Sequence, residues 1–175
     1  MTSDGSCRDL AAVTLTRPSP GNIIWVQDNA IGIFSCFTLT ASMAGTSGLG
    51  SRQYSVVDYS NIRFSEMPAG QHVVATEASK VNCGGYNEIA GGASIHASAG
   101  DLSVLFLPCK MNIIASGVSF DSFFAAEAKS VIRAEAAQFA GFGAVGKQAS
   151  DRAKNAYSAN MGVVILGDLR EGSVK

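Results

Sequence analysis

Cysteine and histidine, the residues of a thiol–imidazole site, are scarce in this 175-residue chain, which has four cysteines and two histidines. A cysteine beside a histidine can act as a thiolate nucleophile when a carboxylate orients the imidazole. Cys83 precedes two glycines and is the cysteine that we expect to be most accessible, with His96 as base and Asp101 or Glu88 as the orienting group. The candidate catalytic residues are therefore Cys83, His96 and Asp101. The alternative is that His72 and His96 are structural residues of apolar strands.

A glycine-rich segment supplies the second candidate site. Gly141, Gly143, Gly146 and Lys147 match the spacing G-x-G-x-x-G and part of a P-loop, motifs that hold a phosphate on backbone N–H groups at a helix N-terminus. Both motifs should follow a buried strand, whereas the residues before Gly141 have a helical pattern. Gln148 also stands where a P-loop has serine or threonine. These four residues are candidate ligand-binding groups, and the alternative that we favour is a structural break between two helices.

The remaining chemistry-bearing residues predict no metal site and no cofactor. Cys7, Cys36, Cys83 and Cys109 include no C-x-x-C pair, and no H-x-x-x-H spacing occurs. The polar N-terminus lacks a basic segment followed by an apolar one, which predicts a protein made without export. We therefore expect reduced thiols and a location in the cytoplasm or within a particle.

The elements that must position these groups are mostly short strands. Between about residues 11 and 119, β-branched and aromatic runs recur at intervals of roughly ten residues, separated by turn-forming residues. This spacing is typical of an antiparallel β-sandwich or barrel. Residues 44–52 contain three glycines and are expected to form a flexible loop. A short echo between residues 41–45 and 97–100 is too brief to indicate a repeat.

The pattern changes at residue 120. Residues 121–139 place apolar side chains at helical spacing, which predicts an amphipathic helix that begins near Asp121. A second, polar helix is expected to end near residue 158, and a final strand is expected at 162–167. Phe123 and Phe124 are expected in the core. The prediction is thus one α+β domain over residues 1–175, β-rich over 11–119 and helical over 120–158.

The composition limits the partners. Charged residues are 15% of the chain and the formal net charge is -1, whereas an average soluble domain has about 25% charged residues. Broad neutralisation of phosphates is therefore not expected, and no nucleic-acid partner is predicted. The longest charge-free run, residues 29–51, keeps its apolar character for only about half the length that a membrane helix needs. No membrane span is predicted.

Two function classes remain open. The first is a non-catalytic structural or assembly subunit, of the coat, tail, shell or filament type, whose partners are copies of itself. Low charge supports this class because the cores of large interfaces are depleted of charged side chains. The alternative is a small-molecule-binding module or small enzyme with a pocket at the glycine-rich residues 83–92 or 141–147. The size of the particle in solution distinguishes the two classes.

Overall fold

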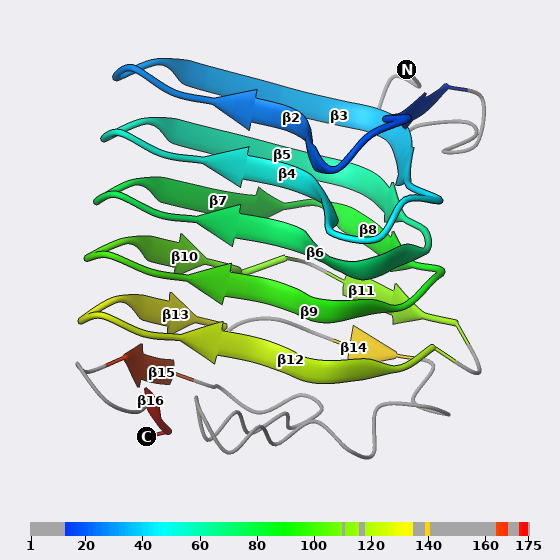
Figure 1. Cartoon of the computed structure of the whole chain (residues 1–175). Helices are drawn as coiled ribbons and strands as arrows, with labels where there is room; N and C mark the ends of the chain where they lie inside the picture. Colours follow the sequence, from blue (N-terminus) through cyan, green and yellow to red (C-terminus); the bar gives the residue numbers. More distant parts are fainter. Residues whose placement is uncertain are drawn as a thin grey trace.

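The chain winds into a stack of parallel rungs. The computed structural model describes residues 13–109, 111–115, 118–134, 139–140, 164–167 and 172–174. All regular elements within these ranges are strands, and they form two sheets that enclose a common core (Figure 1). Each rung contributes one strand to one sheet, a tight turn, and one or two strands to the other sheet. This architecture is a parallel β-solenoid.

The smaller sheet, here called sheet B, has one strand per rung. Its spatial order follows the chain, from β2 (Gly21–Val26) through β4 (Thr46–Ser51), β6 (Met67–Ala75) and β9 (Ala93–Ala99) to β12 (Phe120–Ala126). All neighbouring strands in it are parallel. The five strands define five rungs, which are numbered from the N-terminal end.

The larger sheet, here called sheet A, has eleven strands. Rungs one and two each contribute one long strand to it, and rungs three to five each contribute two shorter strands. The eight strands that the rungs contribute are, in chain order, β3 (Ile31–Thr40), β5 (Val56–Phe64), β7 (Lys80–Gly84), β8 (Tyr86–Ile89), β10 (Val104–Phe106), β11 (Met111–Ile114), β13 (Val131–Arg133) and β14 (Phe139–Ala140). The other three strands lie at the two ends of the stack.

Successive rungs begin at nearly regular intervals along the sequence, although their residues differ. Ile31, Val56, Lys80, Val104 and Val131 occupy the same register position, so the steps are 25, 24, 24 and 27 residues. Equivalent residues stack in columns, spaced by the roughly 4.8 Å that separates neighbouring strands. The neighbours of a side chain therefore lie about one rung away in sequence.

One tight turn per rung joins sheet B to sheet A. Each turn has two consecutive residues with positive φ, such as Asp101 (φ 51°) and Leu102 (φ 65°) in rung four. Turns of neighbouring rungs are also joined by hydrogen bonds. For example, the Leu102 N–H in rung four donates to the Ala128 carbonyl in rung five at 3.0 Å. In rungs two to five a buried serine follows the turn: Ser55, Ser79, Ser103 and Ser130.

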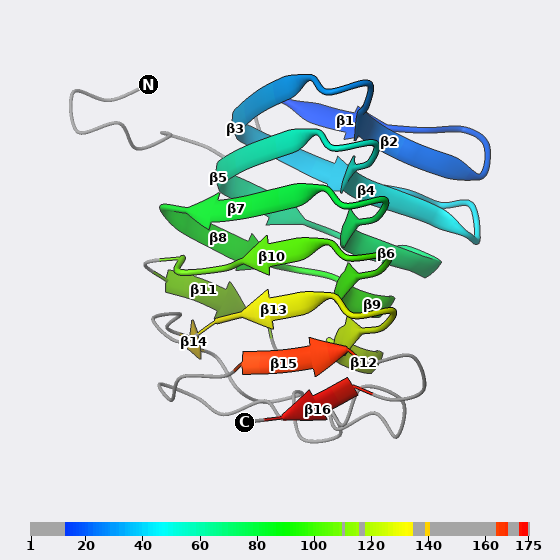
Figure 2. The ribbon, with the colours of Figure 1, turned by 90° about the vertical axis from the view of Figure 1, so that its left-hand side faces the viewer.

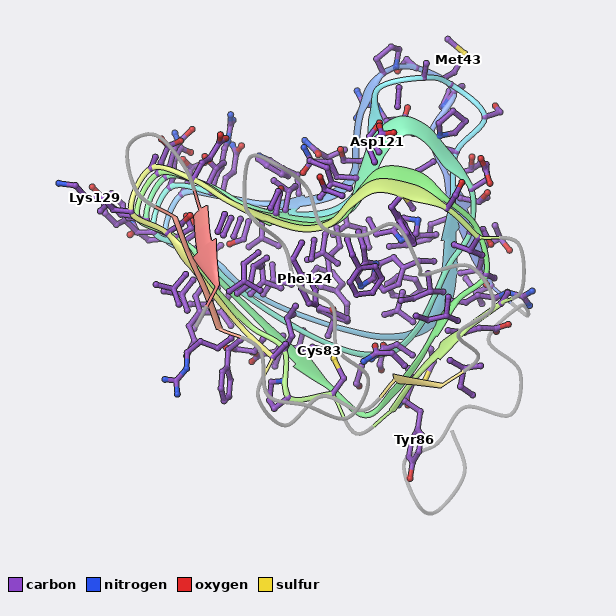
Figure 3. The ribbon with its side chains drawn as sticks, turned by 90° about the horizontal axis from the view of Figure 1, so that it is seen from below. Met43, Cys83, Tyr86, Asp121, Phe124 and Lys129 are labelled. Atoms are coloured by element: carbon purple, nitrogen blue, oxygen red, sulfur yellow. A yellow bond between two sulfur atoms is a disulfide. The ribbon has the colours of Figure 1, made fainter. Side chains whose placement is uncertain are left out.

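Apolar columns fill the space between the sheets (Figure 3). Leu39, Phe64, Ile89 and Ile114 form one such column, and none of them is more than 1% exposed. Because each member covers the next, the burial of a side chain depends on the rung above and the rung below it.

The two ends of the stack differ (Figure 2). At the fifth rung, β15 (Val164–Gly167) pairs antiparallel with β13, and β16 (Gly172–Val174) pairs antiparallel with β15. At the first rung, β1 (Thr14–Thr16) pairs in parallel with only the last three residues of β3. Among the described residues, no strand pairs with the rest of β3 or with β2 on the side away from rung two.

The predicted antiparallel sandwich or barrel is wrong, because all five rungs pair in parallel. Each tight turn joins a strand of sheet B to a strand of sheet A, and strands of the same sheet pair only with those of neighbouring rungs. The flexible loop predicted for residues 44–52 is also wrong, since β4 lies there. Its glycines allow close approach: a Cβ atom on Gly50 would lie 1.8 Å from the Trp25 ring. The chain does repeat, with a period that the short echo did not reveal.

The predicted α+β class is wrong as well, because the described residues contain no helix. The segment expected to be helical contains β12, β13 and β14 instead. Ala128 and Lys129, with φ of 49° and 60°, form the fifth turn and cannot belong to a right-handed helix. Phe123 and Phe124 are buried as predicted, but in a strand. The final strand is confirmed as β15, and residues 141–158 lie outside the described ranges.

Candidate functional site

Cys83 is not an accessible nucleophile. It forms a disulfide with Cys109 of the next rung, with a Cα–Cα distance of 5.2 Å, and it is 4% exposed. The Asn87 amide donates to its sulfur at 3.1 Å. None of the described cysteines is free. The expectation of reduced thiols is therefore wrong for this pair, because the column structure brings together two cysteines that are 26 residues apart.

His96 forms a buried pair with His72 of the preceding rung. The two Nδ1 atoms are 3.1 Å apart, and His72 Nε2 lies 3.1 Å from the Ser65 carbonyl oxygen. A carbonyl only accepts hydrogen bonds, so His72 carries its proton on Nε2. Its Nδ1 therefore accepts a hydrogen bond from the Nδ1–H of His96. The pair is satisfied when both imidazoles are neutral.

Burial keeps both imidazoles neutral. It lowers the pKa of His72 to about 3, against smaller raising effects from the Ser65 and Gly92 backbone. Burial also lowers the pKa of His96 well below 6.5, and the neighbouring His72 lowers it further. A base that is inaccessible and weakened in this way does not serve a surface nucleophile.

Aromatic rings complete the surroundings of the histidine pair. The Phe64 ring stacks on His72 with centroids 5.2 Å apart, and the Phe123 ring stacks on His96 at 4.7 Å. Phe120 meets both imidazoles edge-on. The two histidines are thus part of the aromatic core, which was the structural alternative considered for them.

The structure does not bring the proposed orienting acids to His96. The Asp101 carboxylate lies in the exposed row of turns and accepts a hydrogen bond from the Thr76 hydroxyl at 2.8 Å. Glu88 lies on sheet A and pairs with Arg63 at 3.4 Å. The candidate set Cys83, His96 and Asp101 is therefore dispersed. The second candidate set, Gly141, Gly143, Gly146 and Lys147, lies outside the described residues.

A surface groove of about 620 Å³ lies where the chain returns from sheet A to sheet B. Its walls come from the segments that lead into β6, β9 and β12. In Figure 3 the connection that carries Met43 extends further outward than the chain at Asp121, so the earlier rungs overhang the later ones. The lining residues are Glu66, Pro68, Ala69, residues 90–94 and residues 118–121.

Two closely packed glycines and two carboxylates are among the residues that line this groove. A Cβ atom on Gly91 would lie 2.2 Å from the Glu66 nitrogen, and one on Gly92 would lie 2.6 Å from the Ser119 oxygen. Glu66 accepts a hydrogen bond from the Gly92 N–H at 3.2 Å, and both Glu66 and Asp121 are exposed. Such a surface suits a hydroxyl-rich or cationic ligand. Among the described residues, no group of three or more potential ligands is arranged to hold a metal ion.

Comparisons with known proteins add no assignment. No family model matches the chain, and the searches of curated proteins and of solved structures find no similar protein. In the described part of the chain, no helix is long and apolar enough to cross a membrane.

Sequence reasoning missed the residues that form the two most distinctive surfaces. Glu66 and Asp121 line the same groove only because the stack places the starts of β6 and β12 on one side, two rungs apart. Ile31 and Ile33 lie in the first rung and are 71% and 78% exposed. Aligning the sequence in steps of 24 to 27 residues would have shown that these isoleucines lie at one end of the stack.

Proposed function

We propose that this protein is a non-catalytic structural subunit that works as an assembly of its own copies. Cys83 and His96, two of the three candidate catalytic residues, have structural roles. Cys83 is held in a disulfide, and both histidines are packed among phenylalanine rings. These roles favour a structural protein over an enzyme with a cysteine nucleophile.

The observation that carries the proposal is the near absence of charge from sheet B. Across its five strands, the only charged residue is Asp121. The outward column beside the turns consists of Trp25, Gly50, Val74, Ser98 and Ala125. Surfaces that remain in water usually carry charged side chains, whereas the centres of protein interfaces are depleted of them. Sheet B therefore has the composition of a covered surface.

The test is the mass of the purified protein in solution. Light scattering at micromolar concentration is expected to give at least twice the chain mass of 18.1 kDa. Because uncharged surfaces are involved, raising the salt from roughly 0.1 to 1 M should not dissociate the particle. A monomer under all these conditions would refute the proposal. Dissociation by salt would point to charged contacts instead.

The groove supports a second candidate function, a small-molecule-binding module. The observation that favours it is that two exposed carboxylates, Glu66 and Asp121, line the same groove as Gly91 and Gly92. Thermal-shift measurements with neutral oligosaccharides and with polyamines test this alternative. Stabilisation that disappears in Asp121→Asn would favour it, and the same response in the variant would place binding elsewhere.

A further inference from the structure

We infer that two copies of this protein pair head to head through the first rung, which is the open end of the solenoid. The inference rests on the proposed assembly function and names the surface and the partner. Three features of that rung support it: unused backbone hydrogen-bonding groups, partly exposed core residues, and strands without charged residues.

The backbone of the first rung presents hydrogen-bonding groups that the described residues do not use. In rung two, the Val56 N–H points toward rung one and donates to the Ala30 carbonyl at 3.0 Å. Ile31 occupies the register position of Val56, so its N–H points the same way, toward the open side. Backbone direction alternates along a strand, so the N–H of Ile33 points there too. An edge of this kind is a template for a further strand.

The core is also incompletely covered at this end. Phe34 and Phe37 pack against the core but remain partly exposed. Their register partners one rung below are Tyr59 and Ile62, which are 4% and 0% exposed. The difference arises because the rung-two residues have a neighbour above them. A partner that adds a rung would bury the apolar area of the first one.

The charge pattern favours a second copy as that partner. Neither β2 nor β3 contains a charged residue, although edge strands that face water are usually protected by charges. The same outward columns do carry charges in later rungs. Asp58 is the register partner of Ile33 in rung two, and Lys80 lies in the column of Ile31 in rung three. A twofold axis brings equivalent residues close together, so a charge on the edge would repel its own copy. The uncharged β3 edge is compatible with itself, whereas beside β2 the Arg17 guanidinium donates to the Asn22 carbonyl at 3.0 Å and adds a positive charge to this end.

The other end of the stack makes head-to-tail stacking unfavourable. The free side of β13 is already paired with β15, which runs antiparallel to it. Among the described residues, sheet A ends there in the three-residue β16 and the two-residue β14, so the first rung of another copy finds no long sheet A edge. Two first rungs related by a twofold axis avoid this obstruction and form a closed, isologous dimer. The strands that meet are then antiparallel, which is slightly the more stable arrangement.

The test is a double variant, Ile31→Lys with Ile33→Lys, in the full chain. Lys80 already occupies the column of Ile31 in rung three, so an outward lysine suits sheet A. The matched control is Phe106→Lys, which places a lysine in the column of Ile33 but three rungs away from the edge. Because like charges across an interface cost several kcal/mol, the double variant is expected to weaken dimerisation by roughly 100-fold or more. The control should associate as the wild type does.

Two measurements make the outcomes distinct. Light scattering gives the mass, and hydrogen exchange reports whether the amides of Ile31 and Ile33 are protected. A wild-type dimer with protected amides and a monomeric double variant, both with β-rich circular dichroism, support the inference. A double variant that associates normally overturns it and leaves the assembly function standing. A monomeric wild type overturns both.

Discussion

At the scale of single residues, the column neighbours decide the chemistry. His96 has the properties of a candidate base when its own strand is considered alone. In the stack it lies between His72 and Phe123, which occupy its register position on the rungs before and after it. Cys83 likewise meets Cys109 because the chain returns to the same place one rung later. His96 and Cys83 therefore stabilise the fold.

The buried histidine pair predicts destabilisation in acid. Burial lowers the pKa of His72 to about 3 and that of His96 well below 6.5 in the folded state. The unfolded chain therefore binds more protons below about pH 6.5, so the stabilisation present above that pH is lost as the pH falls. Each histidine contributes a slope of up to about 1.4 kcal/mol per pH unit in the free energy of unfolding. Urea unfolding between about pH 7.5 and 5 measures this slope, above the range where most carboxylates titrate.

The control for this prediction is His96→Phe, which leaves His72 as the only buried imidazole in the column. The slope between about pH 6.5 and 5 should fall to roughly half, whatever the variant does to absolute stability. Equal slopes in the variant and the wild type would show that other groups cause the acid sensitivity.

The Cys83–Cys109 disulfide predicts resistance to alkylation. In denatured, unreduced protein, these two cysteines should remain unlabelled and their peptides should be joined in the mass spectrum. Cys83→Ser is expected to lower the free energy of unfolding by about 3 kcal/mol, since the bond closes a loop of 26 residues. Wild-type protein treated with reductant should lose at least this amount, because reduction also breaks the disulfide of Cys36. Full labelling without reductant would contradict the pairing.

At the scale of elements, the sequence predicts where strands lie but not how they pair. The apolar runs around β3, β5 and β9 were recognised because β-branched and aromatic residues favour extended backbone. Their direction depends on whether a turn folds a strand back onto its own sheet or across to the opposite sheet. Turn residues such as Asp28 and Asn29, both with positive φ, suit either connection.

The wrong helix shows a related limit. Residues 121–139 combine good helix formers with apolar residues at helical spacing, and local propensity alone favours a helix. In the structure, β12 pairs along its length with β9, and Phe124 packs in the column of Ala97. The gain from completing a rung outweighs the local preference. The groove at Glu66 and Asp121 could not be predicted for the same reason, because it exists only once the rungs are aligned.

The close approach of neighbouring segments makes Gly70 a sensitive position. A Cβ atom there would lie 1.8 Å from the Thr46 carbonyl oxygen, which is backbone and cannot easily move. Gly70→Ala is expected to lower the free energy of unfolding by about 1–3 kcal/mol in urea titrations. The matched control is Gly100→Ala, whose Cβ atom would meet only the Glu127 side chain at 3.8 Å. The control should be neutral or slightly stabilising, and equal losses would argue against this packing.

At the scale of the whole molecule, the solenoid is nearly one-dimensional. Each rung contacts mainly the rungs before and after it, so stability is approximately a sum over rungs and the interfaces between them. An end rung and an interior rung therefore differ in how well they are covered. An interior rung has partners on both sides, whereas the first rung leaves Phe34 and Phe37 partly exposed. The exposed end follows from the position of the rung rather than from unusual local sequence.

The same reasoning predicts that a whole rung can be removed. Deleting residues 80–103 joins Ser79 to Val104, which occupies the register position of Lys80, so every later column stays in phase. The variant should keep β-rich circular dichroism and cooperative urea unfolding. Its m-value should fall by roughly a fifth, because m scales with the surface exposed on unfolding. To remove the effect of the disulfide, the variant carries Cys109→Ser and is compared with the full chain bearing Cys83→Ser and Cys109→Ser.

The control deletion is smaller but is expected to do more damage. Deleting residues 80–91, about half a rung, shifts β9 from sheet B into the position of sheet A and puts every later column out of phase. This variant, also with Cys109→Ser, should fail to fold and should be digested rapidly by protease. If it folds as well as the whole-rung deletion, or if both deletions unfold the chain, the columns are not what stabilises the stack. Only a structure built from rungs of 24 to 27 residues predicts that the smaller deletion is more damaging than the larger one.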